Sequence, residues 1–168
     1  MNQTNLEWLK QKLTEELAPI AKSFSGSDLH WHPELLKEKR EVLKNVAKRV
    51  LLEYLEREGR KIVGNERFFL GEFWGYSASY AVDTELQDGD PNHERNSFTI
   101  EWGYNNDEVT LLGEKYDRED YDEILTVEVE LLRQFSVTEK GKSVEEYDLS
   151  IYLRVWVNPH PEWDHWDY

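Results

Sequence analysis

The sequence predicts an α+β fold in which two N-terminal helices pack on one face of a curved antiparallel sheet. The sheet is expected to hold five to six strands, mostly as a meander. Two observations predict this fold: apolar residues recur with helical spacing up to residue 58, and they alternate with period two from residue 67 onwards. The chain of 168 residues has the length of one ordinary domain, and its helical part, sheet and tail are expected to span 1–61, 62–158 and 159–168.

The helical part divides into two segments. Leucines spaced at three and four residues predict an amphipathic helix over 5–21, with Asn5 as its N-cap. A second helix is predicted over 34–58, because Pro33 favours a helix start and Gly59 follows the last turn. At about 1.5 Å per residue this helix would extend about 37 Å, which is enough to cross a whole sheet.

The second part of the chain alternates between apolar and polar or small residues. Clean alternation of this kind is typical of antiparallel strands with one covered face and one solvated face. It occurs in five segments, 67–83, 97–104, 108–113, 125–137 and 146–157.

The parity of the apolar positions specifies two of the turns. Residues that face each other across a hairpin must point to the same side of the sheet, which requires a two-residue turn at Asn106-Asp107. The last hairpin requires a three-residue loop over 139–141, with Gly141 in the left-handed conformation. These turns oppose Tyr104 to Val109, Trp102 to Leu111 and Glu128 to Tyr152.

If the helices cover the apolar face, the opposite face is acidic and carries two aromatic residues and one arginine. Neighbouring strands lie about 4.8 Å apart. Carboxylates on adjacent strands are therefore spaced almost as closely as the phosphates along a nucleic-acid strand. Such a face could serve a basic partner, or it could merely prevent edge-to-edge pairing of sheets. The predicted partner-binding residues are Glu101, Glu128, Glu130, Glu146, Asp148, Tyr152 and Trp156, and Thr99, Thr126 and Arg154 accompany them.

Small residues alternate with aromatic residues between Gly71 and Ala81. They could let a helix approach closely, let the strand bend, or leave a pocket between the sheet and a helix. Such a pocket would support the alternative hypothesis of a small-ligand-binding protein or enzyme. The aromatic residues expected to line the pocket are Trp74, Tyr76, Tyr80 and Trp102.

The net charge of −15 is unevenly distributed, since residues 83–130 alone carry −13 while residues 34–61 carry +3. This charge argues against binding to a nucleic-acid backbone or to an anionic membrane. No apolar run approaches the roughly 18 residues of a membrane span. The first residues also lack the apolar stretch of a secretory signal, so a cytoplasmic location is expected.

Two patterns contain residues of the kind that bind metal ions. Asp28-x-His30-x-His32 places ligand-type side chains at alternate positions, and the tail could add His160, Asp164 or His165. Residues 88–94 resemble the start of a calcium loop, but His93 occupies the position that requires glycine. A helix cap and turn chemistry explain both segments without a metal, so no metal site and no cofactor are assigned.

The sequence therefore favours a non-enzymatic interaction protein, because it contains no nucleophile motif, P-loop or dinucleotide fingerprint. The acidic, aromatic-bearing sheet face would bind a basic protein partner, as inhibitors, immunity proteins and nucleic-acid mimics do. The tail after Asn158 contains three large aromatic residues. It would either fold back on the body or dock to a partner.

Overall fold

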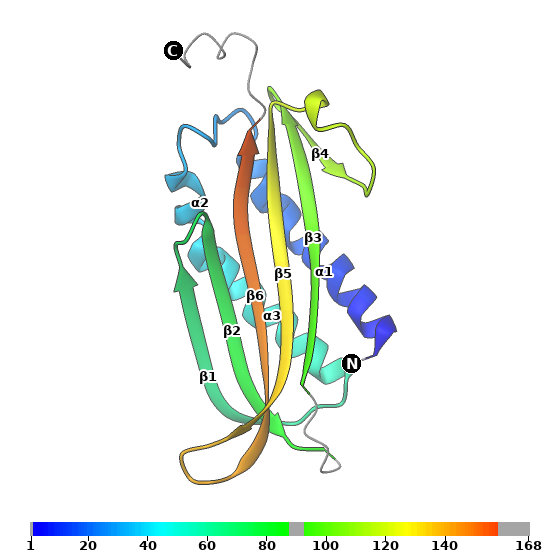
Figure 1. The fold of residues 1–168 in the computed structure, drawn as a ribbon, viewed down its shortest axis with the longest axis vertical. Helices are drawn as coiled ribbons and strands as arrows, with labels where there is room; N and C mark the ends of the chain where they lie inside the picture. The colour runs from blue at the N-terminus through cyan, green and yellow to red at the C-terminus, as the bar shows by residue number, and fades with distance from the viewer. Residues whose placement is uncertain (1, 88–92, 158–168) are drawn as a thin grey trace.

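The computed structural model describes residues 2–87 and 93–157 and confirms the α+β prediction. Three helices precede a sheet of six antiparallel strands (Figure 1). The helices are α1 (Gln3–Ser23), α2 (Glu34–Glu38) and α3 (Arg40–Arg57). The strands are β1 (Ile62–Gly71), β2 (Tyr76–Glu85), β3 (Glu94–Asn105), β4 (Glu108–Leu112), β5 (Glu123–Val137) and β6 (Ser143–Val157), with a 3-10 turn, η1 (Arg118–Asp120), before β5.

The helices differ from the prediction at two points. The N-cap of α1 is Asn2, whose side chain accepts a hydrogen bond from the Thr4 amide at 2.8 Å, so the predicted cap Asn5 lies inside the first turn. The predicted second helix is broken at Lys39, which ends α2 and precedes α3. No proline or glycine marks this break in the sequence, so the apolar spacing alone did not reveal it.

The strand order is β1-β2-β6-β5-β3-β4, which departs from a simple meander. Three hairpins follow one another along the chain, but the last of them inserts between the first two (Figure 1). Its strands β5 and β6 have fifteen residues each and are the longest of the sheet. Because long strands bury the most apolar surface, they take the central positions, while short β4 lies at one edge and β1 at the other.

The segment 67–83, predicted as one alternating strand, forms β1 and β2 joined by a turn at 72–75. In the observed register Phe68 opposes Tyr80 and Gly71 opposes Ser77. Opposed residues are therefore an even number of positions apart. As a result, the residues that point towards the helices have even numbers on both strands. The alternation continues in phase through the turn, which is why periodicity alone could not place it.

Both predicted hairpin registers are confirmed. Tyr104 opposes Val109 and Glu128 opposes Tyr152. Asn106 and Gly141 have the positive φ angles that the two turns require, 54° and 78°.

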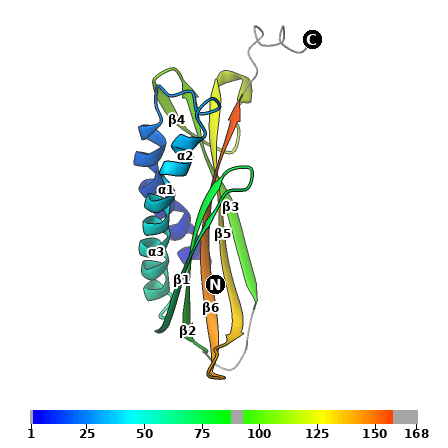
Figure 2. The ribbon, with the colours of Figure 1, turned by 90° about the vertical axis from the view of Figure 1, so that its left-hand side faces the viewer.

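The helices lie on one side of the sheet, as Figure 2 shows. Leucines of α1 and α3 pack against the inward residues of all the central strands, and together they form one hydrophobic core. Of the helices in the described part of the chain, none covers the opposite side, which we call the outer face. Among those same helices, none is both long and apolar enough to cross a membrane.

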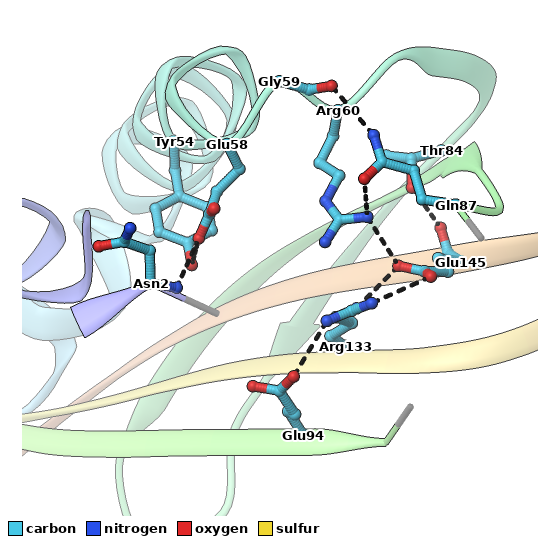
Figure 3. A network of polar contacts seen from close by, with 10 residues as sticks. All are labelled: Asn2, Tyr54, Glu58, Gly59, Arg60, Thr84, Gln87, Glu94, Arg133 and Glu145. Atoms are coloured by element: carbon cyan, nitrogen blue, oxygen red, sulfur yellow. Dashed lines mark hydrogen bonds and ion pairs between the residues drawn. The ribbon is translucent and has the colours of Figure 1, made fainter. Parts of the chain in front are cut away.

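A buried ion-pair network lies where the C-terminal end of α3 approaches the inner face (Figure 3). Arg133 donates two hydrogen bonds to the fully buried Glu145, at 2.7 and 3.1 Å, and a third to Glu94 at 3.0 Å. These bonds raise the pKa of Arg133 above its usual value, so the guanidinium stays charged. Arg60, which follows α3, approaches the same Glu145 carboxylate at 3.6 Å. The network therefore connects β3, β5 and β6 to the end of α3.

We expect Glu145→Gln to destabilise the protein by about 3 kcal/mol, because it removes the buried carboxylate that accepts two of the three hydrogen bonds of Arg133 and leaves only the partly exposed Glu94 as counter-charge. Urea unfolding followed by circular dichroism measures the loss. The control is Glu128→Gln, since Glu128 forms a solvent-exposed ion pair with Arg154 that contributes at most about 1 kcal/mol. Equal losses in the two variants would show that the buried network does not stabilise the sheet.

Candidate functional site

Two adjacent rows of polar side chains cross the middle of the outer face. Each row spans β2, β6, β5 and β3, and we call the eight residues the polar rows. Every one of these side chains bears a hydroxyl or a carboxylate group. The first row is Ser77, Tyr152, Glu128 and Thr99, and the second is Ser79, Ser150, Glu130 and Ser97.

The polar rows line a hollow of about 540 Å³. Short serine side chains form its floor, and the hydroxyl oxygens of Ser79 and Ser150 lie 2.8 Å apart. The longer side chains of Glu128, Glu130 and Tyr152 stand above that floor because they extend further from the same sheet. The result is an open concave surface on which every side chain of the polar rows can accept a hydrogen bond and two carboxylates carry negative charge.

Carboxylates crowd the outer face on one side of the polar rows. Asp148 lies diagonally from Glu130 on β5 and from Asp83 on β2, and Glu146 is two positions before it on β6. Burial raises the pKa of Asp148, and the negative charges of Glu146 and Glu130 raise it further. Ionisation of Asp148 in the folded protein therefore lowers the free energy of unfolding.

Arginine side chains compensate part of this acidic surface. Arg67 binds both Asp83 and Glu146, Arg154 lies 3.2 Å from Glu128, and Arg95 lies 3.7 Å from Glu130. Periodicity predicted the outward direction of these carboxylates, but it could not show which cations would lie beside them. The outer face is thus less negative than the sequence alone suggested.

The remaining predicted partner-binding residues lie on the opposite side of the polar rows. Glu101 accepts hydrogen bonds from the hydroxyls of Tyr116 and Thr126, at 2.7 and 3.0 Å. The Trp156 ring lies under the Arg118 guanidinium at 4.5 Å from its centre. The structure therefore brings all seven predicted residues to one face, with Glu128 and Tyr152 at its centre.

The turn between β1 and β2 exposes two large aromatic side chains beside the polar rows. Phe73 is 77% exposed and Trp74 is 80% exposed. Trp74 has a φ of 57°, a left-handed conformation that costs a non-glycine residue about 1–2 kcal/mol. The Tyr152 hydroxyl donates to the Phe73 carbonyl at 2.6 Å, and Glu72 pairs with Arg40 at 2.8 Å. The turn is therefore held from both faces of the sheet.

The four aromatic residues of the alternative hypothesis do not line one cavity. Trp74 and Tyr76 border a pocket of about 440 Å³ between α2 and the β1–β2 turn. Tyr80 is fully buried in the core, where its hydroxyl donates to Glu66 at 2.6 Å, and Trp102 is 3% exposed. Sequence alternation placed all four on the apolar face of the sheet, but it could not distinguish a core position from the rim of a pocket, and Trp74 lies in the exposed turn instead.

The small residues near this turn lie on the outer face. Ser77 opposes Tyr152, and Ala81 opposes Asp148, so both point away from the helices. The expectation that they let a helix approach closely is therefore wrong. A side chain at Gly75 would collide with the carbonyl oxygen of Leu153 and with the Tyr152 ring, so glycine is required for the approach of the turn to β6.

His30 is bound within the protein. Its Nδ1 lies 2.8 Å from the carboxylate of Glu123, which is 4% exposed and also accepts hydrogen bonds from the Leu29 and His30 amides. His32 pairs with the neighbouring Glu34 at 3.2 Å. Within 2–87 and 93–157, no three histidine or acidic side chains converge as metal ligands would. Residues 88–92 of the calcium-like segment and the tail lie outside the described residues.

Comparisons with protein-family models, with curated proteins and with solved structures give no match. A functional site can therefore be assigned only from the geometry of this chain. The polar rows and the aromatic turn are joined through Tyr152, and together they form a continuous polar and aromatic surface. Phe73 belongs to this surface but was not predicted, because it lies in a turn that the alternation of residues did not reveal.

We expect Asp148→Asn to stabilise the protein at neutral pH by up to about 1 kcal/mol, because it removes a charge among like charges on neighbouring strands. A carboxyl whose pKa is raised by folding favours the folded state at low pH, and this contribution disappears as the pH rises through the raised pKa. The difference between variant and wild type should therefore shrink as the pH falls towards about 4. Urea unfolding across this pH range measures it.

The matched control is Glu146→Gln, which removes a partner of Arg67 and should not stabilise the fold. A destabilised Asp148→Asn variant at neutral pH would contradict the interpretation of crowded charge.

Proposed function

We propose that this chain is a non-enzymatic interaction protein that binds a basic protein partner in the cytoplasm through its outer face, as an inhibitor, immunity protein or nucleic-acid mimic does. The observation that carries the proposal is the chemistry of the polar rows: eight neighbouring side chains offer hydroxyls and carboxylates on a face that the described helices leave uncovered. Neither a nucleic acid nor a membrane is proposed as a partner, because the net charge is −15.

A lysine or arginine of the partner fits the hollow chemically. Glu128 and Glu130 stand above the serine floor and can accept its hydrogen bonds. The arginines that now pair with these carboxylates, Arg154 and Arg95, have half-exposed side chains. Since exposed ion pairs contribute only about 0–1 kcal/mol, a cation of the partner can replace them at small cost.

Asp148 supports a cationic partner for a second reason. Its ionised form is disfavoured in the free protein by burial and by Glu146 and Glu130. A positive charge beside Glu130 would offset its repulsion of Asp148, so the part of the cost that comes from this repulsion would be recovered in the complex. Functional surfaces commonly retain charges at such a cost.

The exposed aromatic turn would supply the apolar part of the interface. Tryptophan and other large aromatic residues dominate binding energy at interfaces when a partner buries them. Phe73 and Trp74 lie beside the polar rows, and the Tyr152 hydroxyl holds their backbone in place. The partner would therefore combine basic side chains with an apolar recess.

Reversal of charge in the polar rows tests the proposal. We expect Glu128→Lys/Glu130→Lys to weaken binding of an oligolysine peptide by about tenfold or more at low salt, because both carboxylates of the hollow are lost. Fluorescence anisotropy measures the affinity. The control is Glu53→Lys/Glu56→Lys, two exposed residues of α3 whose reversal changes the net charge equally. Equal weakening in both variants would show that only net charge matters.

A second candidate function is binding of a small ligand in the pocket between α2 and the β1–β2 turn. The pocket has apolar walls from Leu29, Leu36 and Val155 and a charged group from Arg154. Trp74, which lies at its rim, is held in a strained backbone conformation, and strain of this kind is concentrated at functional sites.

A thermal-shift screen against metabolites and divalent metals tests this second candidate. We expect a true ligand to raise the melting temperature of the wild type and of Phe73→Ala. The same ligand should fail to raise that of Trp74→Ala, because Trp74 lines the pocket and Phe73 does not. A ligand that stabilises all three proteins equally would bind elsewhere.

A further inference from the structure

The edge strand β1 carries an exposed apolar surface that the proposed function does not use. β1 has ten residues, whereas β4 at the opposite edge has five. Large apolar side chains on both of its faces are each more than a third exposed, namely Ile62, Val63, Phe68, Phe69 and Leu70. An open edge of this kind offers unpaired backbone groups together with apolar side chains, which favours pairing with another strand.

The second half of β1 is the regular part of this edge. Residues 67–71 pair one by one with β2, while the register shifts twice between Ile62 and Arg67. Within residues 2–87 and 93–157, β2 is the only strand that pairs with β1. The segment Phe68–Gly71 contains no proline and no charged residue, and these are the features that usually protect an edge.

We propose that a second copy of this chain pairs with β1 in antiparallel orientation, centred on Phe69, so that the two sheets become continuous. A two-fold axis perpendicular to the sheet leaves the outer face of one copy continuous with the outer face of the other. Opposed residues must then point to the same face, so they must lie an even number of positions apart in the sequence. Phe69 then faces Phe69 of the second copy on the outer face. Phe68 faces Leu70 on the helix side, so all three central pairs are apolar.

The charge near this edge is almost balanced, so it opposes a second copy less than the acidic part of the sheet would. Residues 34–72, which form α2, α3 and β1, hold ten basic and eight acidic residues, although the whole chain carries −15. Two copies that meet at β1 therefore avoid the strong repulsion that residues 83–130, with a charge of −13, would cause elsewhere on the sheet.

The same register also accommodates the charges beside the apolar pairs. It brings Glu66 opposite Glu72, and each arrives with a cation: Lys48 lies 2.9 Å from Glu66, and Arg40 lies 2.8 Å from Glu72. Ion pairs can therefore form across the axis without uncompensated charge.

The oligomeric state of the full chain tests this inference. We expect light scattering after gel filtration to give twice the 20.1 kDa mass of the chain at high concentration. Phe69→Lys should weaken the dimer by about tenfold or more, because two like charges meet at the axis. Phe73→Lys is the matched control: its side chain is equally apolar and also exposed, but it lies in the turn beyond the paired segment.

A mixture of two variants tests the register and guards against misfolding. Phe69→Lys and Phe69→Glu should each be monomeric, and their equimolar mixture should form a dimer, because opposite charges then meet. A monomeric wild type, equal dissociation by Phe73→Lys, or a mixture that stays monomeric would each overturn the proposal. Oligolysine binding at the polar rows is measured independently of these outcomes, so failure here leaves the proposed function untouched.

Discussion

Burial of one side of the sheet beneath α1 and α3 is the constraint on which the rest of the structure depends. The inward residues of the central strands form one core with the leucines of both helices, and this fixes the direction of every alternate side chain. A shift of any strand by one residue would place carboxylates such as Glu128 in the core and Val127 in water. The polar rows are therefore a consequence of the same burial that stabilises the fold.

The alternation of apolar and polar residues predicted much of this arrangement. It specified the outward direction of Glu101, Glu128 and Asp148, because strand periodicity is local and depends on one buried face. It could not reveal the turn at 72–75, where the alternation continues in phase, or the insertion of the last hairpin. Strand order depends on contacts between distant segments, and these leave no trace in the spacing of residues along one strand.

The polar contacts of the site were even less predictable from sequence. Arg67 lies between Asp83 and Glu146 only because β2 lies between β1 and β6, and the Arg133–Glu145 pair is buried only because both face the end of α3. A count of charges predicts the sign of a surface but not the pairs within it. On the outer face, arginines consequently neutralise several carboxylates, whereas Asp148 remains crowded among other acidic groups. The count of charges alone suggested a uniformly negative face.

The insertion of the β5–β6 hairpin between the two earlier hairpins also determines when the sheet can be completed during synthesis. β2 and β3 are not neighbours in the sheet. β2 pairs with β6 and β3 pairs with β5, and both of these partner strands are synthesised later. Until β6 has left the ribosome, the two earlier hairpins are not joined into one sheet, so the helices have no complete sheet face to pack against. Pairing between such distant segments is slow, and the unfinished edges are prone to association with other chains. A nascent chain of this architecture therefore depends on β6 to join its two halves into one sheet.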